Sequence, residues 1–286
     1  MEWVQYVLSG ITVGMIYVLV ALGYNIIYNV TEIINFAQGE FVMLGGLCAV
    51  FFYESLHLPL WLAFLMAVVT VGGIGLLFEK FAIRHARSQS ILTLIIVTIA
   101  FSILLKGAAM FAWGKDPYSL PPFSGGSPWL IAGAAVQRQS LWIIGISLFI
   151  IAGLSIFFHK SFYGKAMCAC ADNPVAARIM GIPVRRMILL SFTLSAALGA
   201  AGGVIITPLS LMEYDRGALL GLKGFSVAVL GGLGNFWGAL VAGIFIGVAE
   251  SLCAGYLSSG YKDAVALIAL LAVLFVKPEG LFGRAK

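Results

Sequence analysis

Long apolar stretches, separated by short polar ones, make up most of the chain. No charged residue lies between Glu2 and Glu32, so this stretch exceeds the roughly 20 apolar residues that a membrane-spanning helix needs. Because backbone groups cannot stay unpaired in hydrocarbon, each full-length stretch is expected to be a helix. The pattern predicts nine membrane segments, at about 3–28, 32–53, 60–79, 90–112, 140–159, 188–207, 218–232, 236–257 and 261–277.

The segment at 218–232 is short and flanked by glycines, so we expect a half-helix there. No polar stretch is long enough for a separate soluble domain of ordinary size. We therefore predict an all-α polytopic bundle with eight to nine membrane segments, one of them short or broken. Residues 1–286 are expected to form a single transmembrane domain, with a cytoplasmic loop at about 160–187.

Composition strengthens the membrane assignment. The 286-residue chain is 61% hydrophobic and 10% charged, whereas a soluble globular domain is about 45–50% apolar and about 25% charged. In a soluble protein the net charge of +5 would suggest a nucleic-acid partner, but here we assign the basic residues to membrane topology. The cysteines lack the paired spacing of a disulfide or zinc site: Cys48, Cys168, Cys170 and Cys253.

The basic residues gather in three regions of the predicted topology. Alternation of the nine segments places all three on one side, which the positive-inside rule identifies as the cytoplasm. The N-terminus then faces outward, the C-terminus inward, and 218–232 must cross or nearly cross the membrane. The basic residues concerned are Lys80, Arg84 and Arg87, then Lys160, Lys165, Arg178, Arg185 and Arg186, and finally Lys277, Arg284 and Lys286.

The loop at 160–187 has the pattern of a short capped helix. Asn173 is a favourable N-cap, Pro174 suits the first helical position, and Gly181 suits the left-handed position after a helix end. Such a helix would present a small apolar face in the cytoplasm. Two interpretations stay open from the pattern alone, namely docking to a protein partner and lying flat on the membrane surface.

Glycines and a few polar residues are the candidates for a substrate pathway. Gly231, Gly232 and Gly234 interrupt an apolar region, and broken helices in transporters expose backbone groups near the bilayer midplane. Close helix packing through small residues is the favoured alternative. Asn35 and Gln38 open the second segment together with Glu40, which we place at the cytoplasmic interface. Glu250 lies inside an apolar segment and is expected to line the path or approach the outer interface.

The sequence carries no motif that would make the chain an enzyme. Gly114-Lys115 and Gly164-Lys165 are followed by Asp and Ala, so neither completes a P-loop. His57, His85 and His159 are scattered near segment ends and form no metal motif, and G-x-S-x-G does not occur. If the chain serves ATP-driven transport, hydrolysis must therefore take place on another polypeptide.

Several stretches resemble one family along nearly the whole chain. YGKAMCACADNPVAARIMGIPVRRM, followed by SFTLSAALGAAGGV, resembles the cytoplasmic coupling loop of LivH-type permeases of branched-chain amino acid ABC transporters. INFAQGEFVMLGG, LKGFSVAVLGGLGNFWGALVAGIFIGVAES and the ending YKDAVALIALLAVLFVKPEGLFGR are similar to further motifs of that family. The resemblance implies that the coupling contact to an ATPase involves Gly164, Asn173, Pro174, Ala177, Gly181 and Ile182.

The resemblance also implies function, partners and location. It implies a permease subunit of an ABC importer in the bacterial cytoplasmic (inner) membrane, forming a path for branched-chain or other hydrophobic amino acids. The implied partners are a second, LivM-type permease, two ATPase subunits that bind ATP and Mg, and a periplasmic binding protein. Because that binding protein can supply selectivity, the permease is expected to bind its substrate weakly. No cofactor is expected on this chain itself.

Other functions remain as alternatives. The substrate of a related permease can be urea, an amide or an aromatic acid, and nothing in these residues selects among them. A stand-alone channel would leave the capped helix unexplained. An ion-coupled transporter would need a pair of membrane acids, of which Glu250 is the plausible one.

Overall fold

The structure, a computed structural model, describes residues 2–86, 90–125, 128–131 and 134–283. The chain in these ranges is mainly α-helical, and the all-α class predicted from the sequence is confirmed. The α-helices are α1 (Glu2–Thr31), α2 (Gln38–Val50), α3 (Leu60–Phe78), α4 (Ile91–Trp113), α5 (Arg138–Lys160), α6 (Phe162–Asp172), α7 (Pro174–Ile179), α8 (Val184–Ile206), α9 (Arg216–Gly231), α10 (Phe236–Tyr256) and α11 (Lys262–Val276).

Short elements complete the fold. Two π-helical stretches, η1 (Phe51–Ser55) and η2 (Glu79–Ile83), extend α2 and α3, and a 3₁₀ turn, η3 (Ser259–Tyr261), precedes α11. In the loop between α4 and α5, β1 (Trp129–Ile131) pairs antiparallel with β2 (Ala134–Val136).

Seven helical stretches of the described chain are long and apolar enough to span a membrane. Each of the nine predicted segments coincides with a helix, but α2 and α9 are not among the seven candidate spans. The candidate spans are α1, α3 with η2, α4, α5, α8, α10, and η3 with α11.

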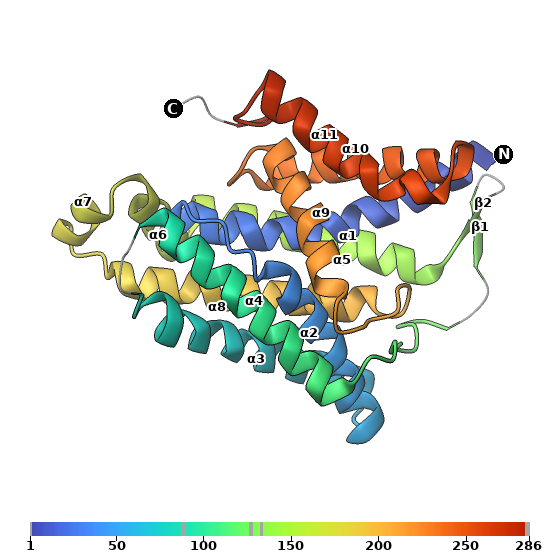
Figure 1. Ribbon diagram of the computed structural model, residues 1–286, viewed down its shortest axis with the longest axis horizontal. Coiled ribbons are helices and arrows are strands. Elements are labelled where there is room, and N and C mark those ends of the chain that lie inside the picture. Colours follow the sequence, from blue (N-terminus) through green and yellow to red (C-terminus); the bar gives the residue numbers. More distant parts are fainter. Residues whose placement is uncertain (1, 87–89, 126–127, 132–133, 284–286) are drawn as a thin grey trace.

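The helices give the molecule two distinct ends. The N-terminus and the β1–β2 pair lie at one end, whereas α7 and the C-terminal part of the chain lie at the other (Figure 1). The described residues of the three basic regions follow η2, surround α6 and α7, and follow α11, all at the α7 end. Arg87, Arg284 and Lys286 lie outside the described residues. We call the two ends the N-terminal end and the α7 end.

Two half-length helices, α2 and α9, lie side by side in the interior. A Cβ added at Gly39 would collide with the Gly217 carbonyl oxygen, so the two backbones touch. Non-helical backbone precedes each half-helix, at residues 32–37 and 211–215. Its polar groups are paired, since Phe36 N donates to Thr98 Oγ1 at 3.2 Å, and Tyr118 and Met212 exchange two backbone hydrogen bonds at 2.8 Å. Such pairing permits non-helical backbone inside the bundle.

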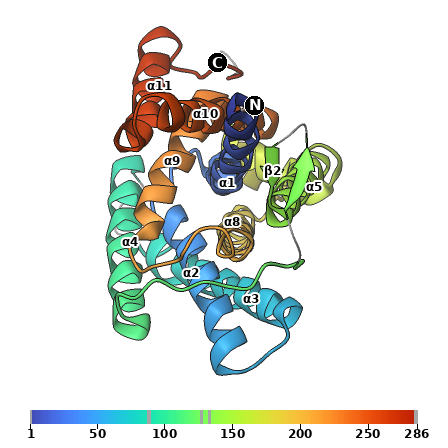
Figure 2. The ribbon, with the colours of Figure 1, turned by 90° about the vertical axis from the view of Figure 1, so that its right-hand side faces the viewer.

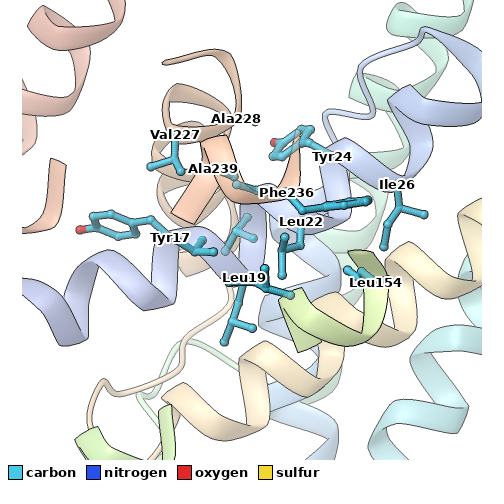
Figure 3. Packing of buried hydrophobic residues seen from close by; sticks show 14 of the residues in the cluster. Tyr17, Leu19, Leu22, Tyr24, Ile26, Leu154, Val227, Ala228, Phe236 and Ala239 are labelled. Carbon is cyan, nitrogen blue, oxygen red and sulfur yellow. The ribbon is translucent and has the colours of Figure 1, made fainter. Parts of the chain in front are cut away.

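Helix α1 is the centre of the packing. Its middle is buried against α8, α9 and α10, and Figure 3 shows Leu19 and Leu22 of α1 in one apolar cluster with Leu154 of α5 and Phe236 of α10. Against α10 the contact is made by glycines. A Cβ added at Gly14 would collide with the Gly243 carbonyl oxygen, as expected where small residues let two membrane helices approach closely.

Candidate functional site

The predicted capped helix is present as α7. The Oδ1 atom of Asn173 accepts hydrogen bonds from the backbone N–H groups of Val175 and Ala176, both at 3.0 Å, and Pro174 occupies the first helical position. Gly181 has a φ of +84°, the left-handed conformation that glycine adopts without strain. The two helix ends are therefore built as the sequence predicts.

The residues of α7, together with Met180 directly after it, fall into an exposed apolar group and a buried group. Val175, Ile179 and Met180 are exposed, Met180 by 81%, although they are apolar. Ala177 is only 4% exposed and faces the protein itself. Ala177 therefore packs α7 against the rest of the chain, and its role in the coupling contact stays a prediction.

Hydrogen bonds and close packing tie α7 to its neighbours. Ile182 N donates to the carbonyl oxygen of Ala177 at 3.0 Å, and α8 begins at Val184, directly after this turn. At the other side, a Cβ added at Gly164 would collide with the Phe157 carbonyl oxygen, so Gly164 lets α6 pack on the end of α5. The predicted coupling residues Gly164 and Ala177 are thus positioning residues, whereas Asn173, Pro174 and Gly181 are exposed and Ile182 is half-buried.

The cysteine pair in α6 lies at Cys168 and Cys170. Among the described residues, no group of three or more His, Cys, Asp or Glu side chains is placed to hold a metal ion. Burial raises the pKa of the Cys170 thiol, and Cys168 nearby raises it further. Cys170 is therefore a neutral packing residue at physiological pH.

The predicted pathway residues are not gathered in one place. Asn35 and Gln38 lie at the start of α2, where the Gln38 amide bonds Ser195, the midpoint of α8. Glu40 accepts a hydrogen bond at 3.0 Å from Ser102, the midpoint of α4, and it is 1% exposed. Glu40 is therefore buried between α2 and α4, and its expected position at the cytoplasmic interface stays a prediction.

The glycine run forms the turn between α9 and α10. Gly232 and Gly234 have φ values of +92° and +86°, and a Cβ added at Gly231 would lie 2.5 Å from the carbonyl carbon of Gly238. Two asparagines of α1 hold this turn, since Asn25 Oδ1 accepts from Gly234 N at 3.0 Å and Asn29 Nδ2 donates to Gly234 O at 2.9 Å. Close packing, the favoured alternative, is thus what these glycines provide.

Glu250 belongs to a buried ionic cluster that sequence reasoning missed. Lys223 of α9 places its Nζ 3.0 Å from Glu250 Oε1 and 2.7 Å from Asp263 Oδ1, while the Tyr17 hydroxyl donates to Glu250 Oε2 at 2.7 Å. Lys223 is 5% exposed and Glu250 is fully buried. One signal was present in the sequence, namely a lysine in the middle of the Gly-rich segment 218–232.

A cavity of about 540 Å³ opens next to this cluster at the N-terminal end. It lies between the first half of α1, β2, the starts of α5, α9 and α11, and the end of α8, the group of elements that Figure 2 shows from this side. Charged side chains from α9 and α11 meet there, and apolar side chains of α1 and α9 form much of the wall. We call it the N-terminal cavity. Its charged residues are Arg216, Lys223, Lys262 and Asp263.

Comparison with known proteins finds relatives along nearly the whole chain. Residues 6–274 match the family described as branched-chain amino acid transport system / permease component. The high-affinity branched-chain amino acid transport system permease protein LivH of Salmonella typhimurium is 32% identical, over 99% of this chain and 96% of its own length. The corresponding BraD of Pseudomonas aeruginosa is 31% identical, with the same two coverages.

One solved structure shares the fold. PsaBC from Streptococcus pneumoniae in complex with Fab aligns with a TM-score of 0.53 and 15% sequence identity. The alignment covers 99% of this chain and 94% of that chain.

Proposed function

Since the chain belongs to the family of branched-chain amino acid transport permease components, we propose that it is a membrane-spanning permease subunit of an ATP-binding cassette importer. It provides a path for branched-chain or other hydrophobic amino acids that a periplasmic binding protein delivers. The observation that carries this proposal is the match to LivH and BraD over 99% of the chain. Seven apolar helices support a multi-pass protein of the inner membrane.

Coupling to ATP hydrolysis is assigned to α7. The chain has no P-loop, so ATP and Mg bind to two separate ATPase subunits. The exposed apolar side chains of Val175, Ile179 and Met180 supply the docking surface, and the hydrogen bonds that join α7 to α8 support transmission of movement into the bundle. A second permease of the LivM type completes the membrane part.

Orientation follows from the same assignment. The α7 end carries most of the basic residues of the described loops, which favours the cytoplasm. The N-terminus is then periplasmic and the C-terminus cytoplasmic, and the N-terminal cavity opens toward the binding protein.

Reconstitution tests the proposal directly. The chain is combined with its ATPases, second permease and binding protein, and ATP-dependent uptake of a solute panel is measured. We expect uptake of leucine, isoleucine or valine that stops without ATP. Full uptake in the absence of ATPase subunits would overturn the coupling, and uptake of amides or urea instead would overturn the substrate.

A substitution at Gly181 tests the role of α7. Gly181→Trp strains a residue at φ +84° and adds bulk next to the docking surface, so we expect uptake or ATPase assembly to be lost while membrane insertion continues. Gly153→Trp in α5 is the control, because an added Cβ there also meets open space. Normal transport by Gly181→Trp would remove the assignment.

A further inference from the structure

We propose that the N-terminal cavity is a low-affinity receiving site for a zwitterionic amino acid with an apolar side chain. The carboxylate is held by Arg216 and the ammonium group faces Asp263. The choice of ligand rests on the proposed function. The site itself is argued from the shape, charge and lining of the cavity.

The size of the cavity suits a small ligand. Its volume of about 540 Å³ lies within the roughly 300–1,000 Å³ of typical ligand pockets. The lining comes from elements far apart in the sequence, including α1, α9 and α11. Its lining includes β2 and the first half of α1, which lie at the end opposite α7, where a solute would arrive from outside under the proposed orientation.

Arg216 has binding capacity that the protein leaves unused. Its Nη2 donates to Ser210 Oγ at 3.1 Å, but its Nε is buried and has no hydrogen-bond partner in the described chain. No ion pair joins it to a carboxylate within the described ranges. A guanidinium group forms its strongest contacts with carboxylates, often through two hydrogen bonds. Lys262 also lines the cavity, but only the Arg216 guanidinium can offer a carboxylate two parallel hydrogen bonds, so Arg216 is the natural partner of the α-carboxylate.

Lys223 differs from Arg216 because its charge is already matched. Glu250 and Asp263 both lie within ion-pair distance of its ammonium group, so it stabilises the cavity floor and leaves the ligand to Arg216. Asp263 keeps 62% of its side chain exposed, whereas Glu250 is fully buried. The accessible carboxylate for a ligand ammonium group is therefore Asp263.

The remaining wall selects for an apolar side chain. Leu8, Ile16 and Leu219 line the cavity together with the hydroxyl groups of Ser9 and Ser140. An aliphatic side chain buries its surface against the leucines and isoleucine, which gives an apolar amino acid a favourable contact that a small polar one lacks. The cavity is open to solvent, so affinity is expected to be low, as suits a site that receives its substrate from a binding protein.

Thiol protection in the complete transporter tests this site. Ser9→Cys is placed in a chain whose four cysteines are replaced by alanine, and maleimide labelling is followed with increasing leucine in the absence of binding protein. We expect millimolar leucine to slow labelling at least about threefold. Ser55→Cys, an exposed residue of η1 outside the cavity, is the labelling control and should not respond.

Arg216→Gln should raise the half-protecting leucine concentration about tenfold, because one charge-assisted contact is lost. Arg138→Gln is the matched control, since Arg138 lies on the start of α5 but does not line the cavity. Isoamylamine is leucine without its carboxylate. At concentrations at which leucine protects Ser9→Cys from labelling, isoamylamine should protect it poorly. Equal protection by isoamylamine would overturn the carboxylate assignment.

Parallel uptake measurements separate the two levels of the argument. If the same preparation imports leucine but leucine leaves Ser9→Cys labelling unchanged, the receiving site is overturned and the proposed function stands. If no amino acid is imported in the complete system, the proposed function fails and the amino-acid site fails with it.

Discussion

At the residue scale, Asn173 and Gly181 determine whether α7 exists as a helix. The helix has only six residues, and isolated helices shorter than about 12–15 residues are marginal in water. Asn173 satisfies two of its free N–H groups, and Gly181 permits the chain to turn toward α8. The sequence predicts both, because caps depend on local side-chain chemistry.

Removing the N-cap should weaken coupling without disturbing the membrane bundle. Asn173→Ala deletes the acceptor of two hydrogen bonds and costs about 0.5–2 kcal/mol of helix stability. We expect reduced leucine-dependent ATPase stimulation and uptake at unchanged permease abundance. Asn173→Asp retains a capping oxygen and should keep most activity. An Asn173→Ala transporter with wild-type ATPase stimulation would show that the Asn173 N-cap does not contribute to coupling.

Glycine contacts between α1 and α10 act at the same scale. A Cβ at Gly14 would strike the backbone of α10, whereas a Cβ at Gly107 in α4 meets nothing within 4 Å. Gly14→Leu should therefore lower the thermal midpoint of the purified complex, or prevent its assembly, while Gly107→Leu should leave both unchanged. Size-exclusion and thermal-shift measurements check this pair. Equal stability of the two variants would show that α1 and α10 can separate at little cost.

At the element scale, α9 is joined to three other helices by a single side chain. Lys223 contacts Tyr17 of α1, Glu250 of α10 and Asp263 of α11. A buried ion pair contributes little net stability, but removing one partner leaves the other charge unpaired. Lys223 thus fixes the position of α9 relative to its neighbours, and it also forms the floor of the N-terminal cavity.

A single and a double substitution distinguish the effect of an unpaired buried charge from a simple loss of packing. Lys223→Met strands the fully buried Glu250 and should cost about 3–5 kcal/mol of stability, seen as a lower thermal midpoint. Lys223→Met combined with Glu250→Met removes both charges and should recover most of that loss. A double variant as unstable as Lys223→Met alone would show that the stranded charge is not the cause.

At the scale of the whole molecule, the helix positions follow from the apolar pattern, and so does the short helix α9, which the sequence predicts as a half-helix at 218–232. The late start of α2 does not follow from that pattern. Residues 32–37 are as apolar as a helix start, so the sequence predicts one segment at 32–53, whereas the structure begins α2 at Gln38. Local and distant groups both hold this stretch, because Asn35 Oδ1 accepts from Ala37 N and Thr98 Oγ1 of α4 accepts from Phe36 N. The Lys223 cluster and the cavity likewise depend on contacts between helices far apart in sequence, which periodicity cannot reveal.

The arrangement of α2 and α9 gives the last prediction, which concerns orientation. The chain segment 32–55, including α2, leads away from the α7 end, and α9 with its preceding loop leads back toward it. We therefore predict that each crosses the membrane in addition to the seven long apolar helices. With nine crossings, Ser55 and Lys165 lie on opposite sides. In intact cells whose chain has its native cysteines replaced, an impermeant maleimide should label Ser55→Cys directly, and Lys165→Cys only after permeabilisation. Labelling of both variants from outside would contradict the crossing of at least one segment between the two positions. Labelling of Lys165→Cys alone would show that the molecule has the opposite orientation, with α7 on the outer side and out of reach of a cytoplasmic ATPase.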